Sequence, residues 1–245
     1  MRDHSLLYCA TVICYTLPTD CICADYIFSP QPTPAATTAV SPFLRTTAEI
    51  PPYRMQYVHG AADFLGVSGP VLLINEISYS APTWSGRVPI DAMLSNIEIR
   101  MSTTPKNPDG LSVNFLENTG VDEMVVFSGP LHYYETGVET YDIHIPIAPF
   151  RYDPSMGNLL IDVFNNAPIT SRRDPDWMVD AVDRYLDSAS TLSGRITDSS
   201  GTLSTFGFMT RFTYTPVPEP STWALLATGV IGLAVFGFKR RRAGR

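Results

Sequence analysis

Few residues of this chain have the types and spacing that catalysis requires. Beyond the N-terminal segment the histidines are His59, His132 and His144. No two of them have the local spacing of metal ligands, and Gly66-Val67-Ser68-Gly69 is not the Gly-x-Ser-x-Gly turn that presents a nucleophilic serine. Asp122 and Glu123 are adjacent and would point to opposite faces of a strand, whereas glycosidases place two carboxylates across a cleft. We therefore expect this protein not to be an enzyme.

A calcium site is the more plausible local chemistry, in the predicted loop between Thr104 and Glu123. Its oxygen-bearing side chains are Asn107, Asp109, Asn114, Glu117, Asn118 and Asp122. Calcium binds several oxygens from one or two loops. The alternative is an ordinary solvated turn with Asp109-Gly110 at its tip. We expect no cofactor by default, and the candidate ligands of a calcium ion are Asp109, Glu117 and Asp122.

Aromatic rings offer a second kind of site, because exposed rings stack on sugar faces. The aromatic residues in or near predicted loops are Trp84, Tyr133, Tyr134, Tyr152 and Trp177. Trp84, Tyr133, Tyr134 and Trp177 are the predicted glycan contacts. The alternative is that these rings fill the interior of the domain.

The charge of the chain is unevenly distributed. Residues 25–216 contain 11 basic and 21 acidic residues, a net charge of −10, whereas residues 239–245 carry a net charge of +5. The body contains one lysine, Lys106, and it lacks the basic stripe that binding to a phosphate backbone requires. We therefore expect no nucleic-acid partner.

The first 24 residues resemble an export signal. All the cysteines fall here: Cys9, Cys14, Cys21 and Cys23. The segment begins with Arg2, is mostly apolar, and ends in Ile22-Cys23-Ala24, where a signal peptidase could cut before Asp25. We predict a signal peptide over residues 1–24, with a buried N-terminal strand or helix as the alternative. Cleavage would leave no cysteine for thiol catalysis or for zinc binding.

A second apolar segment, from Trp223 to Phe238, contains no charged residue. As a helix its 16 residues would span ~24 Å, slightly less than a hydrocarbon core of ~30 Å. Trp223 suits the membrane interface, and the following cations would hold the C-terminus in the cytoplasm. These cations are Lys239, Arg240, Arg241 and Arg242. We predict a single C-terminal transmembrane helix.

The residues directly before this segment are Val217-Pro218-Glu219-Pro220-Ser221-Thr222. Pro218 and Pro220 disfavour the helical conformation for the residue before each of them. Val217 and Glu219 are therefore expected to be extended, as a protease cleft requires. The alternative is a proline-rich spacer before an ordinary tail anchor.

The order of a Pro-Glu-Pro triplet, an apolar helix and an Arg-rich end resembles the PEP-CTERM sorting domain of exported proteins in Gram-negative bacteria that make exopolysaccharide. The resemblance covers about 29 of the 245 residues. It implies that exosortase, a membrane protease/transpeptidase, recognises Pro218, Glu219 and Pro220. It also implies that Trp223 to Phe238 is a temporary inner-membrane anchor and that Lys239 to Arg245 is the cytoplasmic stop. The product would reach the cell surface or the extracellular biofilm matrix.

The region between the two membrane signals is dominated by segments that alternate like β-strands. The predicted strands are Tyr53–Val58, Val71–Ser80, Ile97–Thr103, Glu123–Phe127, Glu139–Ile147, Leu159–Phe164 and Phe206–Tyr214. With 21 prolines and 16 glycines in the chain, they predict a mainly β protein and not a helical bundle. We predict an antiparallel β-sandwich or jelly-roll-like ectodomain over residues 53–216.

Two segments of the body are harder to interpret. Residues 25–52 include a Pro/Thr/Ala-rich stretch without an apolar period, and we expect a linker or a loosely held arm. Asp174 to Ser188 fits a short amphipathic helix with Asp174 as N-cap and Pro175 in its first turn. The alternative is a strand in which Trp177, Val179 and Ala181 share one face.

The sequence thus predicts a signal peptide, an arm, a β-sandwich ectodomain and, over residues 217–245, a sorting signal. We expect an exported surface or extracellular-matrix protein that is structural or associated with exopolysaccharide. Its expected partners are exosortase, the membrane and extracellular polysaccharide. The alternative is a permanently tail-anchored envelope protein with a carbohydrate-binding ectodomain.

Overall fold

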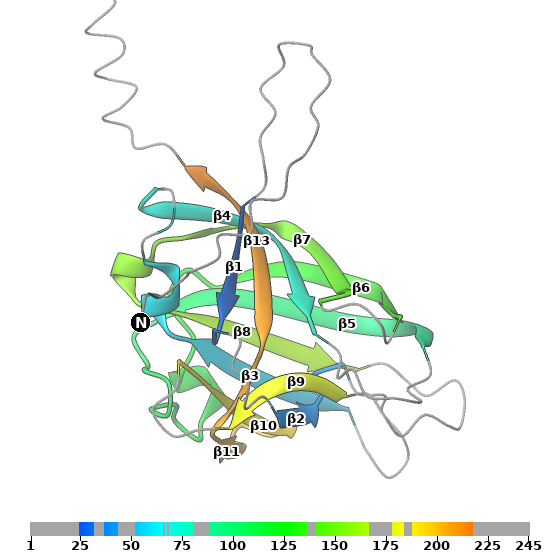
Figure 1. Cartoon of the computed structure of the whole chain (residues 1–245). Helices are drawn as coiled ribbons and strands as arrows, with labels where there is room; N and C mark the ends of the chain where they lie inside the picture. The colour runs from blue at the N-terminus through cyan, green and yellow to red at the C-terminus, as the bar shows by residue number, and fades with distance from the viewer. Residues whose placement is uncertain are drawn as a thin grey trace, which may run out of the picture.

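The computed structural model describes residues 25–31, 37–43, 52–65, 67, 69–80, 89–136, 141–166, 178–183 and 188–217. This part of the chain forms antiparallel strands and short 3-10 helices (Figure 1). The strands are β1 (Asp25–Ser29), β2 (Thr37–Val40), β3 (Tyr53–His59), β4 (Val71–Tyr79), β5 (Ile90–Thr104), β6 (Met124–Glu135), β7 (Ile143–Tyr152), β8 (Asn158–Asn165), β9 (Met178–Asp183), β10 (Ala189–Arg195), β11 (Thr202–Ser204), β12 (Phe206–Phe208) and β13 (Thr210–Val217). The 3-10 helices are η1 (Ala61–Phe64), η2 (Phe115–Glu117) and η3 (Pro154–Met156). The mainly β, antiparallel prediction is confirmed.

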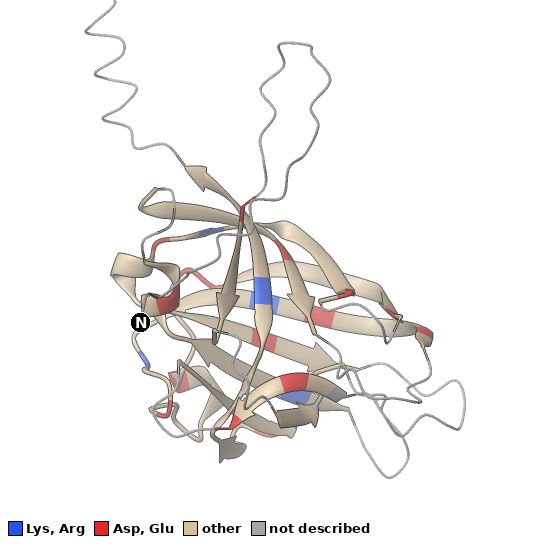
Figure 2. Ribbon diagram, in the orientation of Figure 1, with Lys and Arg blue, Asp and Glu red and all other residues tan. Residues whose placement is uncertain are grey.

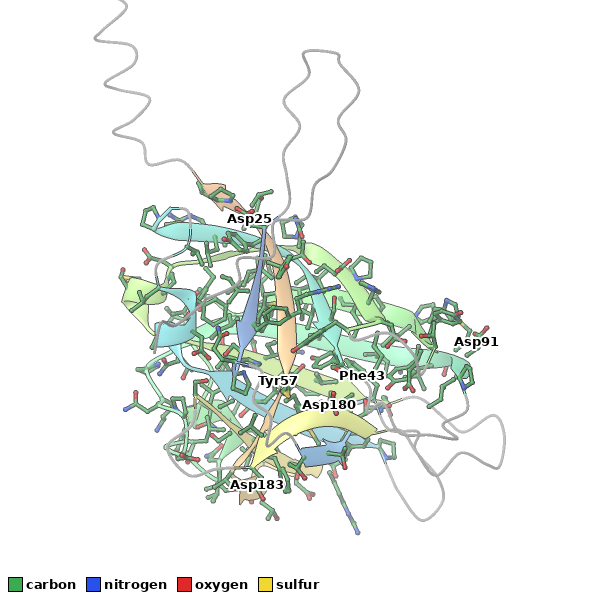
Figure 3. The ribbon with its side chains drawn as sticks, in the orientation of Figure 1. Asp25, Phe43, Tyr57, Asp91, Asp180 and Asp183 are labelled. Carbon is green, nitrogen blue, oxygen red and sulfur yellow. The ribbon has the colours of Figure 1, made fainter. Side chains whose placement is uncertain are left out.

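Two large sheets enclose the main core. One has the strand order β1-β13-β4-β7 and the other β11-β10-β3-β8-β5-β6, while β12-β9-β2 form a smaller third sheet. Aromatic side chains join the two large sheets across the core. Tyr57 of β3 and Tyr79 of β4 share a hydrogen bond between their hydroxyl groups, and the His59 ring packs edge-on to Phe212 of β13. Figure 3 labels Tyr57 near the centre of the molecule.

The period of two decides which side chains enter this core. Ile97, Ile99 and Met101 of β5 are buried, whereas Glu98 and Arg100 between them are partly exposed. The same alternation buries alternate residues of β7. Strand alternation in the sequence therefore places the correct face of these strands toward the core.

Residues 25–52 are not a loosely held arm where the structure describes them. β1 pairs with β13, and β2 pairs with β9. Ile27 lies in the main core, and Phe43 is fully buried against Tyr79. These strands are too short to show a clear period in the sequence, and pairing with strands from the far end of the chain fixes them.

The helix favoured for residues 174–188 is also wrong where the structure describes it. Met178 to Asp183 form β9, which lies between β2 and β12. Val179 and Ala181 are fully buried, and Asp180 between them is partly exposed. Two ladder partners outweigh the helical propensity of so short a segment. The remainder of the predicted helix lies outside the described residues.

The outer face of the six-stranded sheet is covered by the segment between β5 and β6. Leu111 and Phe115 of this segment pack on Val58, Leu160 and Leu192 in a second apolar cluster. The cover explains why β3 and β8 are buried on both faces.

A buried ion pair lies beside this second cluster. Arg54 donates from Nε and Nη2 to the carboxylate of Asp162, with an Nη2 to Oδ2 distance of 2.5 Å. The guanidinium lies between the rings of Phe115 and Phe164, 4.6 and 4.5 Å from their centroids. Gln56 donates to Asp162 at 2.8 Å and to the Phe115 carbonyl at 3.1 Å. This network fastens the covering segment to the sheet.

Candidate functional site

The C-terminal segment leaves the domain from the end of β13. The last residue of β13, Val217, lies opposite Val71 of β4. The other neighbour, β1, is described from Asp25 onward, and Asp25 lies opposite Tyr214. Among the described residues, the last three residues of β13 therefore pair with β4 alone. The next residue is Pro218, which has no N–H to extend the ladder.

The two predicted membrane signals attach to neighbouring strands at one end of this sheet. Asp25, which opens β1, directly follows the predicted signal peptide, and Val217 directly precedes the Pro-Glu-Pro triplet. Figure 3 labels Asp25 at the end of the sheet toward which β13 runs. The antiparallel register places Asp25 opposite Tyr214, three residues before Val217, although Asp25 and Val217 are 192 positions apart in the chain.

A buried polar cluster fastens the other end of β1. Ser29 donates from Oγ to Asp63 Oδ2 at 2.6 Å, and His59 Nδ1 lies 3.1 Å from the same Oγ. Since the serine hydrogen is given to Asp63, His59 Nδ1 must donate, and the buried Nε2 has no partner among the described residues. Serine, histidine and aspartate are the residue types of a catalytic triad. Here, however, the serine lies between the other two and is fully buried, so the cluster clamps β1.

The buried His59 makes the free energy of unfolding depend on pH. Burial lowers the pKa of His59 to about 3 from an ordinary 6.5, although a hydrogen bond with Ser29 opposes this shift. Below pH 6.5 the unfolded chain binds a proton that the folded chain does not, so stability is full above this pH and falls with acidification. Between pH 6.5 and about pH 5 we expect urea unfolding to show a loss of about 2 kcal/mol.

His132 provides a matched control for this pH dependence because it lies on the exposed face of β6. We expect a His59→Leu variant to lose most of the dependence and a His132→Gln variant to keep it. An unchanged dependence in His59→Leu would contradict the assignment to this imidazole.

The predicted glycan contacts differ in how far the structure exposes them. Tyr134 is 47 % exposed, but Tyr133 is buried with its ring near Phe43, and Tyr152 is fully buried. Tyr133 and Tyr152 therefore cannot stack on a sugar, and Tyr133 is corrected to a core residue. Trp84 and Trp177 lie outside the described residues.

Tyr134 belongs to a small exposed group on the β5–β6 ribbon. It lies opposite Asp91, and its ring centroid is 5.9 Å from that of His132. His132 Nε2 in turn lies 2.8 Å from Asp91 Oδ1. Figure 3 labels Asp91 at the tip of this ribbon, far from Asp25.

The three calcium candidates have protein neighbours of their own. Asp122 accepts a hydrogen bond from the Thr103 backbone, and Glu117 accepts one from the Ser112 hydroxyl. Across the described ranges, no three His, Cys, Asp or Glu side chains gather as metal ligands. Figure 2 shows the acidic residues spread over the strands and their connections. Calcium binding stays a prediction.

An open cavity of about 400 Å³ lies beside this segment. Its lining residues are Asp109, Ser190, Leu203, Ser204 and Thr205. Asp109 holds a left-handed backbone conformation with φ of 59°, and its N–H donates to the Ser190 hydroxyl. The sequence predicted no role for this cavity.

The outer face of the four-stranded sheet carries a polar group that sequence reasoning missed. Glu76 Oε1 accepts hydrogen bonds from Ser78 at 3.0 Å, from His144 Nδ1 at 3.1 Å and from Thr213 at 3.2 Å. Burial alone would raise the pKa of Glu76, but the bonds from His144, Ser78 and Thr213 together hold this pKa below its ordinary value. Arg211 Nη2 lies 4.0 Å from the same oxygen. The carboxylate is therefore ionised and fixed in orientation.

The residues with predicted roles in sorting lie outside the described residues. They are Pro218, Glu219, Pro220, Trp223, Phe238, Lys239, Arg240, Arg241 and Arg242. Within the described residues, none of the helices is long and apolar enough to cross a membrane.

Comparison with known proteins identifies the C-terminal segment. The family model described as the PEP-CTERM protein-sorting motif matches residues 216–242. No curated protein and no solved structure matches the chain. The match begins at Pro216 and therefore overlaps the last two residues of β13.

Proposed function

Because this chain carries a PEP-CTERM sorting motif, which indicates an exported, exosortase-targeted surface protein, we propose that its β domain is a non-catalytic structural or polysaccharide-associated component of the cell surface or matrix. The observation that carries the proposal is the direct junction between the last strand and the motif. The precursor is held in the inner membrane by Trp223 to Phe238 and is then released by processing near the Pro-Glu-Pro triplet.

The short connection between the domain and the apolar segment supports one orientation of the precursor at the membrane. Three residues, Pro218 to Pro220, and the short Ser221-Thr222 pair separate Val217 from the apolar segment. At ~3.3 Å per extended residue this connection spans less than about 20 Å. The end of the sheet that contains Asp25 and Val217 therefore faces the bilayer in the precursor.

Because this connection is short, the end of β13 must separate from β4 before exosortase can bind the chain. A protease binds its substrate as an extended chain, and the backbone of residues 215–217 is already paired with β4. Strand ends open at low free energy when few contacts hold them, and among the described residues only β4 pairs with residues 215–217. Exosortase therefore gains access when the last residues of β13 separate from β4.

An engineered disulfide tests whether the end of β13 must open for processing. Residues 25–245 contain no cysteine, and the Val71→Cys/Val217→Cys pair would join β4 to β13 at their last paired position. We expect the oxidised variant to convert precursor to product at least about tenfold more slowly, the effect of ~1.4 kcal/mol on opening. Pulse-chase labelling measures the rate, and a reducing agent should restore it.

The matched control is Tyr26→Cys/Thr213→Cys, which joins β1 to β13 upstream and leaves the last residues of β13 free. Its processing rate is expected to equal that of the wild type. Equal rates in both disulfide variants would show that the end of β13 does not open for processing.

A further inference from the structure

We propose that the outer face of the four-stranded sheet, around Glu76 and Arg211, binds a neutral saccharide. This inference rests on the surface role proposed above and names the ligand class. The strand register aligns two adjacent rows across this face, Tyr26-Thr213-Glu76-Pro146 and Phe28-Arg211-Ser78-His144. The intervening residues, such as Ile27 and Phe212, point into the core, so both rows face outward.

The polar side chains of this face are held in place but keep free hydrogen-bonding atoms. Arg211 Nη2 donates to Ser78 and to the Tyr141 carbonyl, and His144 Nδ1 and the Ser78 and Thr213 hydroxyls bond Glu76 Oε1. Among the described residues, Arg211 Nη1, His144 Nε2 and Glu76 Oε2 take part in no hydrogen bond. His144 Nε2 is an acceptor in the neutral ring and a donor in the protonated ring. The face thus presents a guanidinium donor, a carboxylate acceptor and an imidazole nitrogen that a hydroxyl group can bond in either state.

An exposed ring lies beside these groups. Tyr26 is 59 % exposed, and the Arg211 guanidinium carbon lies 6.0 Å from its ring centroid and 5.6 Å from that of Tyr141. The contact limits the motion of both the guanidinium and the ring. The exposed Tyr26 ring can stack on the apolar face of a sugar, and the neighbouring polar groups can bond its hydroxyls.

The charges favour a neutral ligand. Glu76 would repel an anion, Arg211 would repel a cation, and the two charges lie close enough to offset each other. The net charge of −10 over residues 25–216 further disfavours an acidic polysaccharide. A sugar hydroxyl both donates and accepts hydrogen bonds, so it can use the guanidinium and the carboxylate together.

Calorimetric titration of the full chain tests the proposal without dependence on processing. The protein is kept in a polyoxyethylene detergent, which contains no sugar. The probes are cellohexaose, maltohexaose and mannohexaose, with hexagalacturonate as the anionic comparison. We expect at least one neutral hexasaccharide to bind and hexagalacturonate to bind at least about tenfold more weakly.

Two variants and a matched control locate the site. Glu76→Gln removes the charge while keeping the shape, and Tyr26→Ala removes the exposed ring. We expect each to weaken binding at least about fivefold. Leu116→Ala removes an exposed apolar side chain on η2, over the outer face of the six-stranded sheet, and is expected to leave the affinity unchanged.

Lack of binding by all three neutral hexasaccharides would overturn the proposal. Tighter binding of hexagalacturonate would do so too, as would equal losses in Tyr26→Ala and Leu116→Ala. The sorting role is independent of these results, because it is judged by the mass of the secreted product.

Discussion

A Glu219→Ala variant is expected to stop processing while leaving membrane insertion intact. Glu219 is the charged residue of the Pro-Glu-Pro triplet, and the resemblance to PEP-CTERM proteins assigns it to recognition by exosortase. The predicted transmembrane segment and the basic tail, which are expected to drive insertion, are unchanged. The variant should therefore accumulate in the inner-membrane fraction as a species longer than the product by Trp223 to Arg245. Fractionation and immunoblotting against the ectodomain measure both species.

Two comparisons make the Glu219 result specific. Deleting the exosortase from the host should produce the same long species from the wild-type chain. Replacing Arg240, Arg241 and Arg242 with serine should act differently, because loss of the cytoplasmic cations lets the tail slip through or invert. Normal processing of Glu219→Ala would remove this residue from the recognition signal.

The largest effect on stability is expected from an Asp162→Ala variant. It leaves the buried Arg54 guanidinium without its counter-ion and removes the acceptor of Gln56. Removing one partner of a buried ion pair costs about 3–5 kcal/mol. Urea unfolding of the secreted protein measures this loss. Exposure of the segment that carries Phe115 should accompany it, because the network fastens that segment to the sheet.

The matched control is Glu98→Ala on the neighbouring strand. Glu98 pairs with Arg100 at 2.6 Å, but about a third of each side chain is exposed. Such a surface pair contributes about 0.2–1 kcal/mol. Similar losses in Asp162→Ala and Glu98→Ala would mean that the buried pair does not hold the covering segment.

The strands that the sequence predicts are those whose pattern is local. Ile97, Ile99 and Met101 alternate with charged residues, so the period of two is visible without knowledge of the partners. β1 and β9 lack this advantage, because each is a few residues long and depends on pairing with distant strands. The pairing of Asp25 with Tyr214 is a contact between the two ends of the body, and no local pattern encodes it.

The same limit applies to the side chains of the sites. Tyr133 and Tyr134 are both tyrosines, so the residue type does not distinguish them. The register of β6 places Tyr133 in the core and Tyr134 on the exposed face. The group around Glu76 draws on three strands, β4, β7 and β13, so its members are far apart in the sequence. The sorting motif differs, since its triplet, apolar segment and basic end are contiguous and can be recognised directly.

Intact-mass measurement of the secreted wild-type protein tests the central claim most directly. Sorting by exosortase predicts a product whose C-terminus falls near Pro218 to Pro220 and that lacks Trp223 to Arg245. A product that still contains Trp223 to Arg245 would contradict the sorting account and leave a permanently anchored protein.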